Sequence, residues 1–404
     1  GYRRDGSWYR KDIEISNISS GQVFQLYFEG VNITSKVYVN GKNVGEHIGG
    51  YIGFNLDITG AVKEGKNQIL VYANNGYNPE VIPSQKSDFF IYGGITRDVW
   101  LKTLPAEHVN DLKITTPKVT SSNAALNAKV LITNPKNSKL SVEAVLADND
   151  GNMVKTAVFD VVDNSADINF TNITNPNLWD TKNPYLYNLT VALVKDGKTI
   201  DEVNENVGFR WFEFKDFGAF YLNGKRLKLR GTHRHEEHAG VGSAMSNIQH
   251  RTDMELIKEM GANFVRLAHY PQDPEIYKAC DELGILVWDE LPWCRGGLGN
   301  DAWKKNTKYM LKEIIEQNYN HPSVILWSLG NEIYWLPDFE GGDDIGQLKD
   351  YLSELNDYAH KLDPTRKTAI RKFYEGSDIV DVFSPSIWSG WYSCLLYTSD
   401  AADE

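Results

Sequence analysis

Five short apolar runs in the second half of the chain are each followed by side chains that could do chemistry. These segments are Gly231–His238, Arg266–Pro271, Asp289–Trp293, Ser328–Glu332 and Ser384–Trp388. Together they offer carboxylates, imidazoles and aromatic rings. A carbohydrate site needs this mixture, because rings stack on sugar faces, polar groups bind hydroxyls and a carboxylic acid supplies a proton. The pattern predicts a sugar site if the five segments meet in space.

Glu332 is the strongest candidate for the proton donor. It follows the apolar run Val324–Trp327, and a glutamate at the end of a buried strand is partly shielded from water, as a general acid needs to be. The alternative is a loop glutamate or a charge at a helix N-terminus, since Asn-Glu is a common dipeptide. Asn331 could orient a substrate hydroxyl or simply end the strand.

Three histidines, His233, His235 and His238, could indicate a metal site instead, because some barrel hydrolases begin their metal site with His-x-His. That arrangement needs further histidines after the fifth and sixth runs. The segments there, from Arg371 and from Ser384, contain none. Histidines bonded to neighbouring carboxylates are the remaining alternative.

Other candidates have a structural explanation that is as good as a functional one. Asp289 and Glu290 could hold arginines near the site, and we favour this role for Asp289. Four tryptophans near the ends of the runs could be sugar platforms or core residues, and singly the core is the commoner place. They are Trp293, Trp335, Trp388 and Trp391.

The elements that must position these residues alternate between strands and helices after Phe209. The expected strands are 227–230, 263–267, 285–288, 324–327, 368–370 and 379–383, and the expected helices are 251–260, 274–283, 308–317 and 347–361. Repeated strand–helix units predict a parallel sheet, and eight of them close a TIM barrel whose active site lies at the carboxyl ends of the strands. Six units predict an incomplete barrel over residues 209–393.

The first half of the chain reads as all-β. Short alternating runs separated by turns such as Asn40-Gly41 predict a jelly-roll sandwich over residues 1–104 and an immunoglobulin-like sandwich over 107–208. Residues 394–404 look like an unrelated tail. Since Gly1 follows no methionine, we expect that a targeting segment has been lost, which leaves the compartment open, with a weak preference for the periplasm or the extracellular space.

Composition limits the partners. The chain has 404 residues and a formal net charge of -12, which does not suit nucleic acid, and no apolar stretch is long enough for a membrane span. The cysteines are only Cys280, Cys294 and Cys394, too few for a disulfide framework. A carbohydrate is the partner we expect, and the oligomeric state stays open.

The ordered motifs resemble glycoside hydrolase family 2, most closely its β-galactosidases, over about residues 1–393. The similar segments are 28–31, 37–41, 49–51, 57–59, 87–99, 175–187, 207–210, 229–236, 265–271 and 327–332. The resemblance implies that Glu332 is the acid/base of a retaining mechanism that needs no cofactor and that Asn331, His235 and His269 contact the sugar. It also implies that Arg266 supports the site and that Asp88 reaches it from the first sandwich.

The resemblance also shows departures. The family's nucleophile, a glutamate after the seventh strand, has no counterpart here, so we expect the chain alone to be inactive. His233, Ser386 and Trp388 replace an asparagine, an asparagine and a tyrosine. The Glu-x-His that binds magnesium in some members is absent around Cys294, so no metal is expected. Galactoside specificity of the parent rests mainly on Arg234-His-Glu236; glucuronides, mannosides or a non-catalytic carbohydrate-binding fragment are the alternatives.

Overall fold

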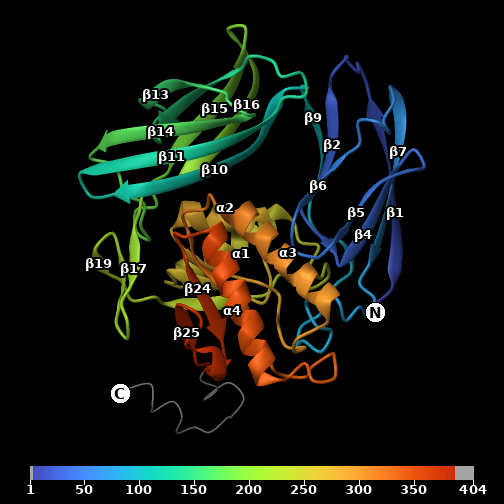
Figure 1. The fold of residues 1–404 in the computed structure, drawn as a ribbon, viewed down its shortest axis with the longest axis vertical. Coiled ribbons are helices and arrows are strands. Elements are labelled where there is room, and N and C mark those ends of the chain that lie inside the picture. The colour runs from blue at the N-terminus through green and yellow to red at the C-terminus, as the bar shows by residue number, and fades with distance from the viewer. Residues whose placement is uncertain (1–2, 387–404) are drawn as a thin grey trace.

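The computed structural model describes residues 3–386 as two β-sandwiches and an α/β half-barrel (Figure 1). In the first sandwich one sheet has the order β1-β7-β4-β5, a second has the order β6-β2-β9, and β3 pairs with β8. The bounds are β1 Gly6–Ile15, β2 Val23–Phe28, β3 Val31–Asn32, β4 Thr34–Val39, β5 Lys42–Ile48, β6 Phe54–Asp57, β7 Gly65–Asn74, β8 Gly94–Ile95 and β9 Val99–Leu104. Every second residue of β2 is buried, as expected of a strand with one face on a core.

The second sandwich packs the sheet β10-β11-β14 on the sheet β13-β12-β15-β16. Its strands are β10 His108–Val119, β11 Asn123–Thr133, β12 Ser141–Ala147, β13 Met153–Asp160, β14 Ser165–Thr174, β15 Tyr187–Lys195 and β16 Lys198–Val207. A small antiparallel sheet of β17 Phe212–Phe214, β18 Phe220–Leu222 and β19 Lys225–Arg226 leads into the third part. The two sandwiches and the half-barrel predicted from the sequence are confirmed.

The half-barrel is one parallel sheet in which the strands follow the chain order β20 to β25. These strands are β20 Gly231–Arg234, β21 Phe264–Leu267, β22 Leu286–Glu290, β23 Val324–Asn331, β24 Lys367–Arg371 and β25 Val382–Ser384. All residues of β22 and β23 are buried, because the sheet is covered on both faces. Within residues 3–386 the sheet is open, with β20 and β25 at its edges.

The expected first strand of the barrel, 227–230, was misplaced. The structure instead forms β20 at 231–234, where Gly231 pairs with Phe264 of β21. Leu227 and Leu229 are partly buried against a cluster that contains Trp179, Trp288 and Leu326. The alternation of Leu227 and Leu229 with polar residues therefore reflects their packing against this cluster. It does not mark a strand that is hydrogen-bonded into the parallel sheet.

Four helices cover the sheet: α1 Asn247–Glu259, α2 Pro274–Leu283, α3 Asp301–Asn318 and α4 Ile345–Leu362. A short 3-10 helix, η1 (Tyr374–Gly376), lies between β24 and β25. Helix α3 begins seven residues before its expected start, because the Asn300 side chain accepts a hydrogen bond from the Trp303 backbone N–H and caps it. In the part of the chain that the structure describes, no helix has the length and apolar character to cross a membrane.

Buried polar contacts join the sandwiches to the half-barrel. Arg97 of the first sandwich binds Glu236 through two nitrogens, at 3.0 and 3.2 Å, and donates to the backbone carbonyls of Tyr51 and Pro271 at 2.9 and 2.7 Å. The Trp179 indole of the second sandwich donates to the carbonyl of Asp281 at 2.8 Å. The first sandwich is thereby held over the carboxyl end of the parallel sheet.

Candidate active site

Glu332 lies directly after β23 at the carboxyl end of the sheet and is only 4% exposed. The strand bulges just before it, between Ser328 and Asn331. Gly330 is required there, because a Cβ atom would lie 2.8 Å from the carbonyl oxygen of Trp293. The bulge re-aims the end of the strand, which is a common role for bulges beside active sites.

Two cations hold the Glu332 carboxylate. Arg295 Nε lies 3.1 Å from Oε2, and Lys372 Nζ lies 3.5 Å from Oε1. All three residues adopt left-handed backbone conformations, with φ of 51° at Glu332, 59° at Arg295 and 52° at Lys372. Such conformations cost about 1 kcal/mol or more for residues with a Cβ and gather where a site over-determines the backbone. Backbone strain is therefore concentrated on the carboxylate and its two partners.

Asn331 is oriented by two arginines. Its Oδ1 accepts hydrogen bonds from Arg371 at 2.8 Å and from Arg266 at 3.1 Å, and its Nδ2 lies 3.5 Å from Cys294 Sγ. With the oxygen occupied, the amide nitrogen is the atom left to donate to a ligand.

Glu290 is the fully buried carboxylate at the centre of the site. It binds Arg266 at 2.7 and 2.9 Å, His269 Nδ1 at 2.7 Å, the Ser328 hydroxyl at 3.0 Å and the Trp288 indole at 3.1 Å. Burial would raise its pKa, but Arg266 and His269 together lower the pKa of Glu290 to about 2. It is therefore an ionised anchor for the arginine and the imidazole.

Asp289 points elsewhere, so the prediction that it holds an arginine was wrong. Its carboxylate accepts from the Tyr277 hydroxyl at 2.9 Å and from the Asn318 amide at 2.7 Å. Burial raises the pKa of Asp289 to about 6. Successive residues of a strand face opposite sides, so Glu290 points into the site and Asp289 toward the helices.

The two candidate histidines lie together under an aromatic ring of the first sandwich. The Phe89 ring centroid is 5.6 Å from that of His235 and 5.7 Å from that of His269. Burial, followed by the charges of His269 and His233, lowers the pKa of His235 to about 4. His235 is therefore neutral near pH 7 and can accept as well as donate a hydrogen bond.

Asp88 precedes Phe89 on the same loop and pairs with Arg295 of the half-barrel. Its Oδ2 lies 2.7 Å from Arg295 Nη2, and Arg295 also binds Glu332. The adjacent Ser87 hydroxyl donates to the Cys294 carbonyl at 2.8 Å. The loop from the first sandwich thus forms part of the site wall.

The remaining sequence candidates fall into three groups. His238 lies in an exposed turn, and His233, His235 and His238 form no ligand set among residues 3–386. Trp293 is a core residue, whereas Trp335 is 38% exposed with Arg295 over its ring. Trp388 and Trp391 lie outside the described residues.

Two of the three residues expected to favour galactosides, Arg234 and Glu236, lie in structural ion pairs. Arg234 binds Asp253 at 2.6 and 3.0 Å and Gln272 at 2.5 Å, and Glu236 is the partner of Arg97. Both side chains are buried. These contacts account for the buried positions of Arg234 and Glu236 without any role in binding a sugar.

Sequence reasoning missed four residues of the site, namely Arg295, Arg371, Lys372 and Phe89. Arg295 and Lys372 follow β22 and β24, so the rule that reactive groups lie at the carboxyl ends of strands would have found both. Phe89 gave no signal by itself.

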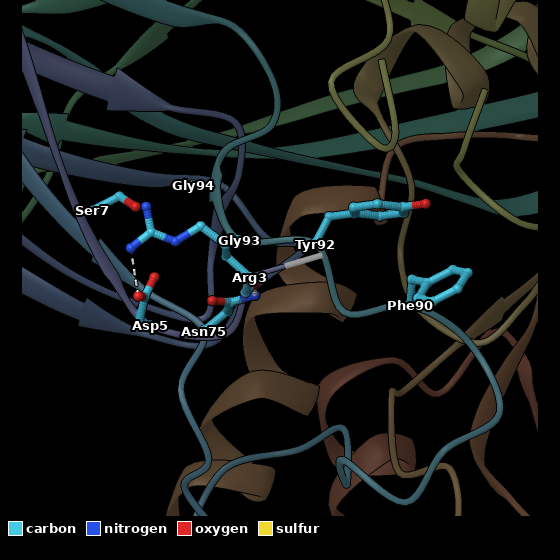
Figure 2. Close-up of a pocket in the computed structure, with 8 residues that line it drawn as sticks. All are labelled: Arg3, Asp5, Ser7, Asn75, Phe90, Tyr92, Gly93 and Gly94. Carbon is cyan, nitrogen blue, oxygen red and sulfur yellow. Dashed lines mark hydrogen bonds and ion pairs between the residues drawn. The ribbon is translucent and has the colours of Figure 1, made fainter. Parts of the chain in front are cut away.

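A cavity of about 400 Å³ lies in the first sandwich and contains none of the predicted site residues. Figure 2 shows its lining, in which Arg3 and Asp5 form an exposed ion pair at 2.6 Å. Phe90 and Tyr92, which also line it, belong to the loop that carries Asp88. This cavity is distinct from the site around Glu332.

Three family models match the chain in sequence order. They are "Glycosyl hydrolases family 2, sugar binding domain" over residues 3–105, "Glycosyl hydrolases family 2" over 107–210 and "Glycosyl hydrolases family 2, TIM barrel domain" over 212–398. The three matches follow the two sandwiches and the half-barrel.

Similar proteins carry two activities in their names. The chain is 70% identical over 393 residues to a Formosa agariphila protein named "Putative beta-glucuronidase", covering 97% of this chain and 48% of that protein. It is 35% identical to a beta-galactosidase of Thermoanaerobacter pseudethanolicus, covering 94% of this chain and 50% of that protein. A solved structure of Parabacteroides merdae beta-glucuronidase superposes with a TM-score of 0.94 at 41% identity, covering 99% of this chain and 52% of that one. The chain spans about half the length of these relatives.

Proposed function

Because this chain belongs to glycoside hydrolase family 2, we propose that it forms the acid/base half of a retaining β-glucuronidase, with Glu332 as the proton donor. The single observation that carries the role of Glu332 is its position: a nearly buried carboxylate at the carboxyl end of β23, held by Arg295 and Lys372, which follow the neighbouring strands β22 and β24.

The choice of sugar is supported by the relatives and by the charge of the site. The relatives at 70% and 41% identity carry the name beta-glucuronidase. Four basic side chains, Arg266, Arg295, Arg371 and Lys372, surround Asn331 and Glu332. These four cations outnumber by one the carboxylates of Asp88, Glu290 and Glu332 that lie among them, which favours an anionic sugar over a neutral one.

The mechanism follows from the two-carboxylate scheme of retaining glycosidases. Glu332 gives a proton to the leaving oxygen as the bond from the anomeric carbon to that oxygen breaks. The family's second glutamate, which belongs after a seventh strand, forms the bond to the anomeric carbon. Glu332 then takes a proton from water, whose oxygen attacks that carbon and releases the sugar.

The described carboxylates beside Glu332 are poor substitutes for that nucleophile. Asp88 is paired with Arg295, and Glu290 is paired with Arg266 and His269. In the proposed roles, Asn331 donates a hydrogen bond to the sugar hydroxyl next to the scissile bond, and Arg266 holds the Asn331 amide in place. His235 and His269 bind other hydroxyls of the sugar. Residues 1–404 alone are therefore expected to bind sugar without hydrolysing it.

Hydrolysis of β-galactosides is the second candidate, because a relative with 35% identity is named beta-galactosidase. Of the three residues that first favoured it, Arg234 and Glu236 are engaged in buried ion pairs, and His235 lies in the site beside Phe89. Neither candidate needs a cofactor.

The test uses a full-length version of the enzyme that contains this chain, assayed with nitrophenyl β-glucuronide and nitrophenyl β-galactoside. We expect kcat/KM to be at least about 100-fold higher for the glucuronide, equivalent to about 2.7 kcal/mol. A preference for the galactoside would replace the sugar assignment. Glu332→Gln should abolish hydrolysis of unactivated glycosides, because their leaving oxygen needs a proton. Nitrophenyl substrates need no such proton when the bond to the leaving group breaks, so this first step should be largely spared. Full activity on an unactivated substrate would remove Glu332 from its role.

A further inference from the structure

Asp88, His269 and Cys294 come together in the site although they belong to three separate segments. One ligand atom of each residue lies within 4.8 Å of the ligand atoms of the other two. His269 and Cys294 are buried, and Asp88 is exposed. Among the described residues, this is the one group of three or more histidine, cysteine, aspartate or glutamate side chains with such spacing.

The surrounding hydrogen bonds resemble those that support metal ligands. His269 Nδ1 lies 2.7 Å from Glu290 and 3.1 Å from Arg266 Nη2. In the tautomer that donates its Nδ1 proton to Glu290, Nε2 is the ligating nitrogen. A carboxylate behind a ligating histidine fixes the ring and raises its basicity. The Asn331 amide donates to Cys294 Sγ at 3.5 Å and can stabilise a thiolate.

We propose that Asp88, His269 and Cys294 bind one thiophilic divalent cation, such as Zn²⁺ or Cd²⁺, with water as the fourth ligand. Bonds of about 2.0 to 2.3 Å place tetrahedral ligand atoms roughly 3.5 Å apart. The exposed Asp88 side chain can move toward the ion, and the buried His269 and Cys294 side chains must close any excess distance between their own ligand atoms. Arg295 binds Oδ2 of Asp88, so the carboxylate keeps its ion pair and ligates through Oδ1.

Binding replaces the Cys294 S–H bond with a sulfur–metal bond, and the proton leaves to solvent. A cation that takes the place of this proton needs a high affinity for thiolate, which Zn²⁺ and Cd²⁺ have.

The same donors exclude magnesium, which prefers oxygen ligands in octahedral geometry. A thiophilic ion here lies among the residues that the proposed function assigns to sugar binding. The ion is therefore an inhibitor of that function, although the binding itself rests only on the three donors and not on the proposed activity.

The test is a Co²⁺ titration of the 404-residue chain carrying Cys394→Ser, which removes a thiol outside the described residues. We expect a thiolate-to-cobalt charge-transfer band in the near ultraviolet that saturates at one ion per chain and disappears when Zn²⁺ is added. Cys294→Ser should abolish this band. Cys280→Ser, which changes the other buried thiol, should keep it and is the matched control.

Asp88→Asn provides a second variant that does not threaten the fold, since this side chain is exposed. Loss of a ligand should weaken Co²⁺ binding by more than the roughly 10-fold expected from loss of a supporting hydrogen bond. Circular dichroism of each variant reports folding separately. Absence of a saturable band in the folded chain, a band that survives Cys294→Ser, or unchanged affinity in Asp88→Asn would each overturn the proposal.

Discussion

Arg295 binds the Glu332 carboxylate with Nε 3.1 Å from Oε2. Its other end reaches Asp88 at 2.7 Å, so one side chain of the half-barrel connects the candidate acid with a loop of the first sandwich. The acid is therefore positioned by two parts of the fold at once.

Replacing Arg295 tests this positioning. In the full-length enzyme, Arg295→Gln should lower kcat/KM by about 10-fold to 100-fold, because the charged hydrogen bond to Glu332, worth about 1.5–3 kcal/mol, is lost. Steady-state kinetics measure the effect. The matched control is Lys308→Gln, which breaks the exposed pair with Glu354 and should leave kinetics unchanged.

Glu290→Gln should destabilise the chain. Arg266 would be left as a buried cation without its carboxylate, at a cost of about 3–5 kcal/mol. Urea unfolding near neutral pH measures this loss, with Lys312→Gln at an exposed pair as the control. A loss below about 1 kcal/mol would contradict the buried pairing.

Acid should weaken the same anchor. The folded pKa of Glu290, about 2, is below its ordinary value, so its contribution to stability is complete above about pH 4.3 and is lost as pH falls toward 2. The difference in unfolding free energy between the wild type and Glu290→Gln should shrink over that range. A difference independent of pH would show that Glu290 stabilises by packing instead of charge.

His321 gives the opposite pH dependence at the junction with the second sandwich. Burial lowers its pKa, but Asp281, 2.6 Å from Nδ1, outweighs burial, so the pKa of His321 is raised. The stabilisation is complete below about pH 6.5 and is lost as pH rises through the folded pKa. The cost of His321→Gln, from urea unfolding, should be larger near pH 5.5 than near pH 9. An equal cost at both pH values would contradict this.

Glu236→Gln should loosen the first sandwich from the half-barrel. It leaves the buried Arg97 guanidinium without its carboxylate, at a cost of about 3–5 kcal/mol. Limited proteolysis should then release the first sandwich from the rest of the chain sooner than in the wild type. Arg97→Lys should not preserve the interface. A lysine ammonium lacks the planar guanidinium with which Arg97 binds Glu236 and the backbone carbonyls of Tyr51 and Pro271 at once.

Much of this site could be predicted from sequence because apolar runs locate buried strands, and the residue after each run must lie at one edge of a parallel sheet. That rule placed Glu332, Asn331 and His269. The rule failed at Leu227–Arg230, since an apolar alternation reports burial and not which backbone groups pair. Contacts such as Arg295 with Asp88, 207 residues apart, leave no trace in local sequence.

The arrangement around Arg97 has a consequence for engineering chimeras. Its guanidinium binds a glutamate and a carbonyl from the half-barrel as well as carbonyls of its own sandwich. A sandwich grafted from another enzyme would therefore dock only if it brought an arginine in this place. It would complete the candidate site only if its loop also presented an aspartate to Arg295. Recombination between homologous genes should accordingly succeed when both determinants are inherited as one block.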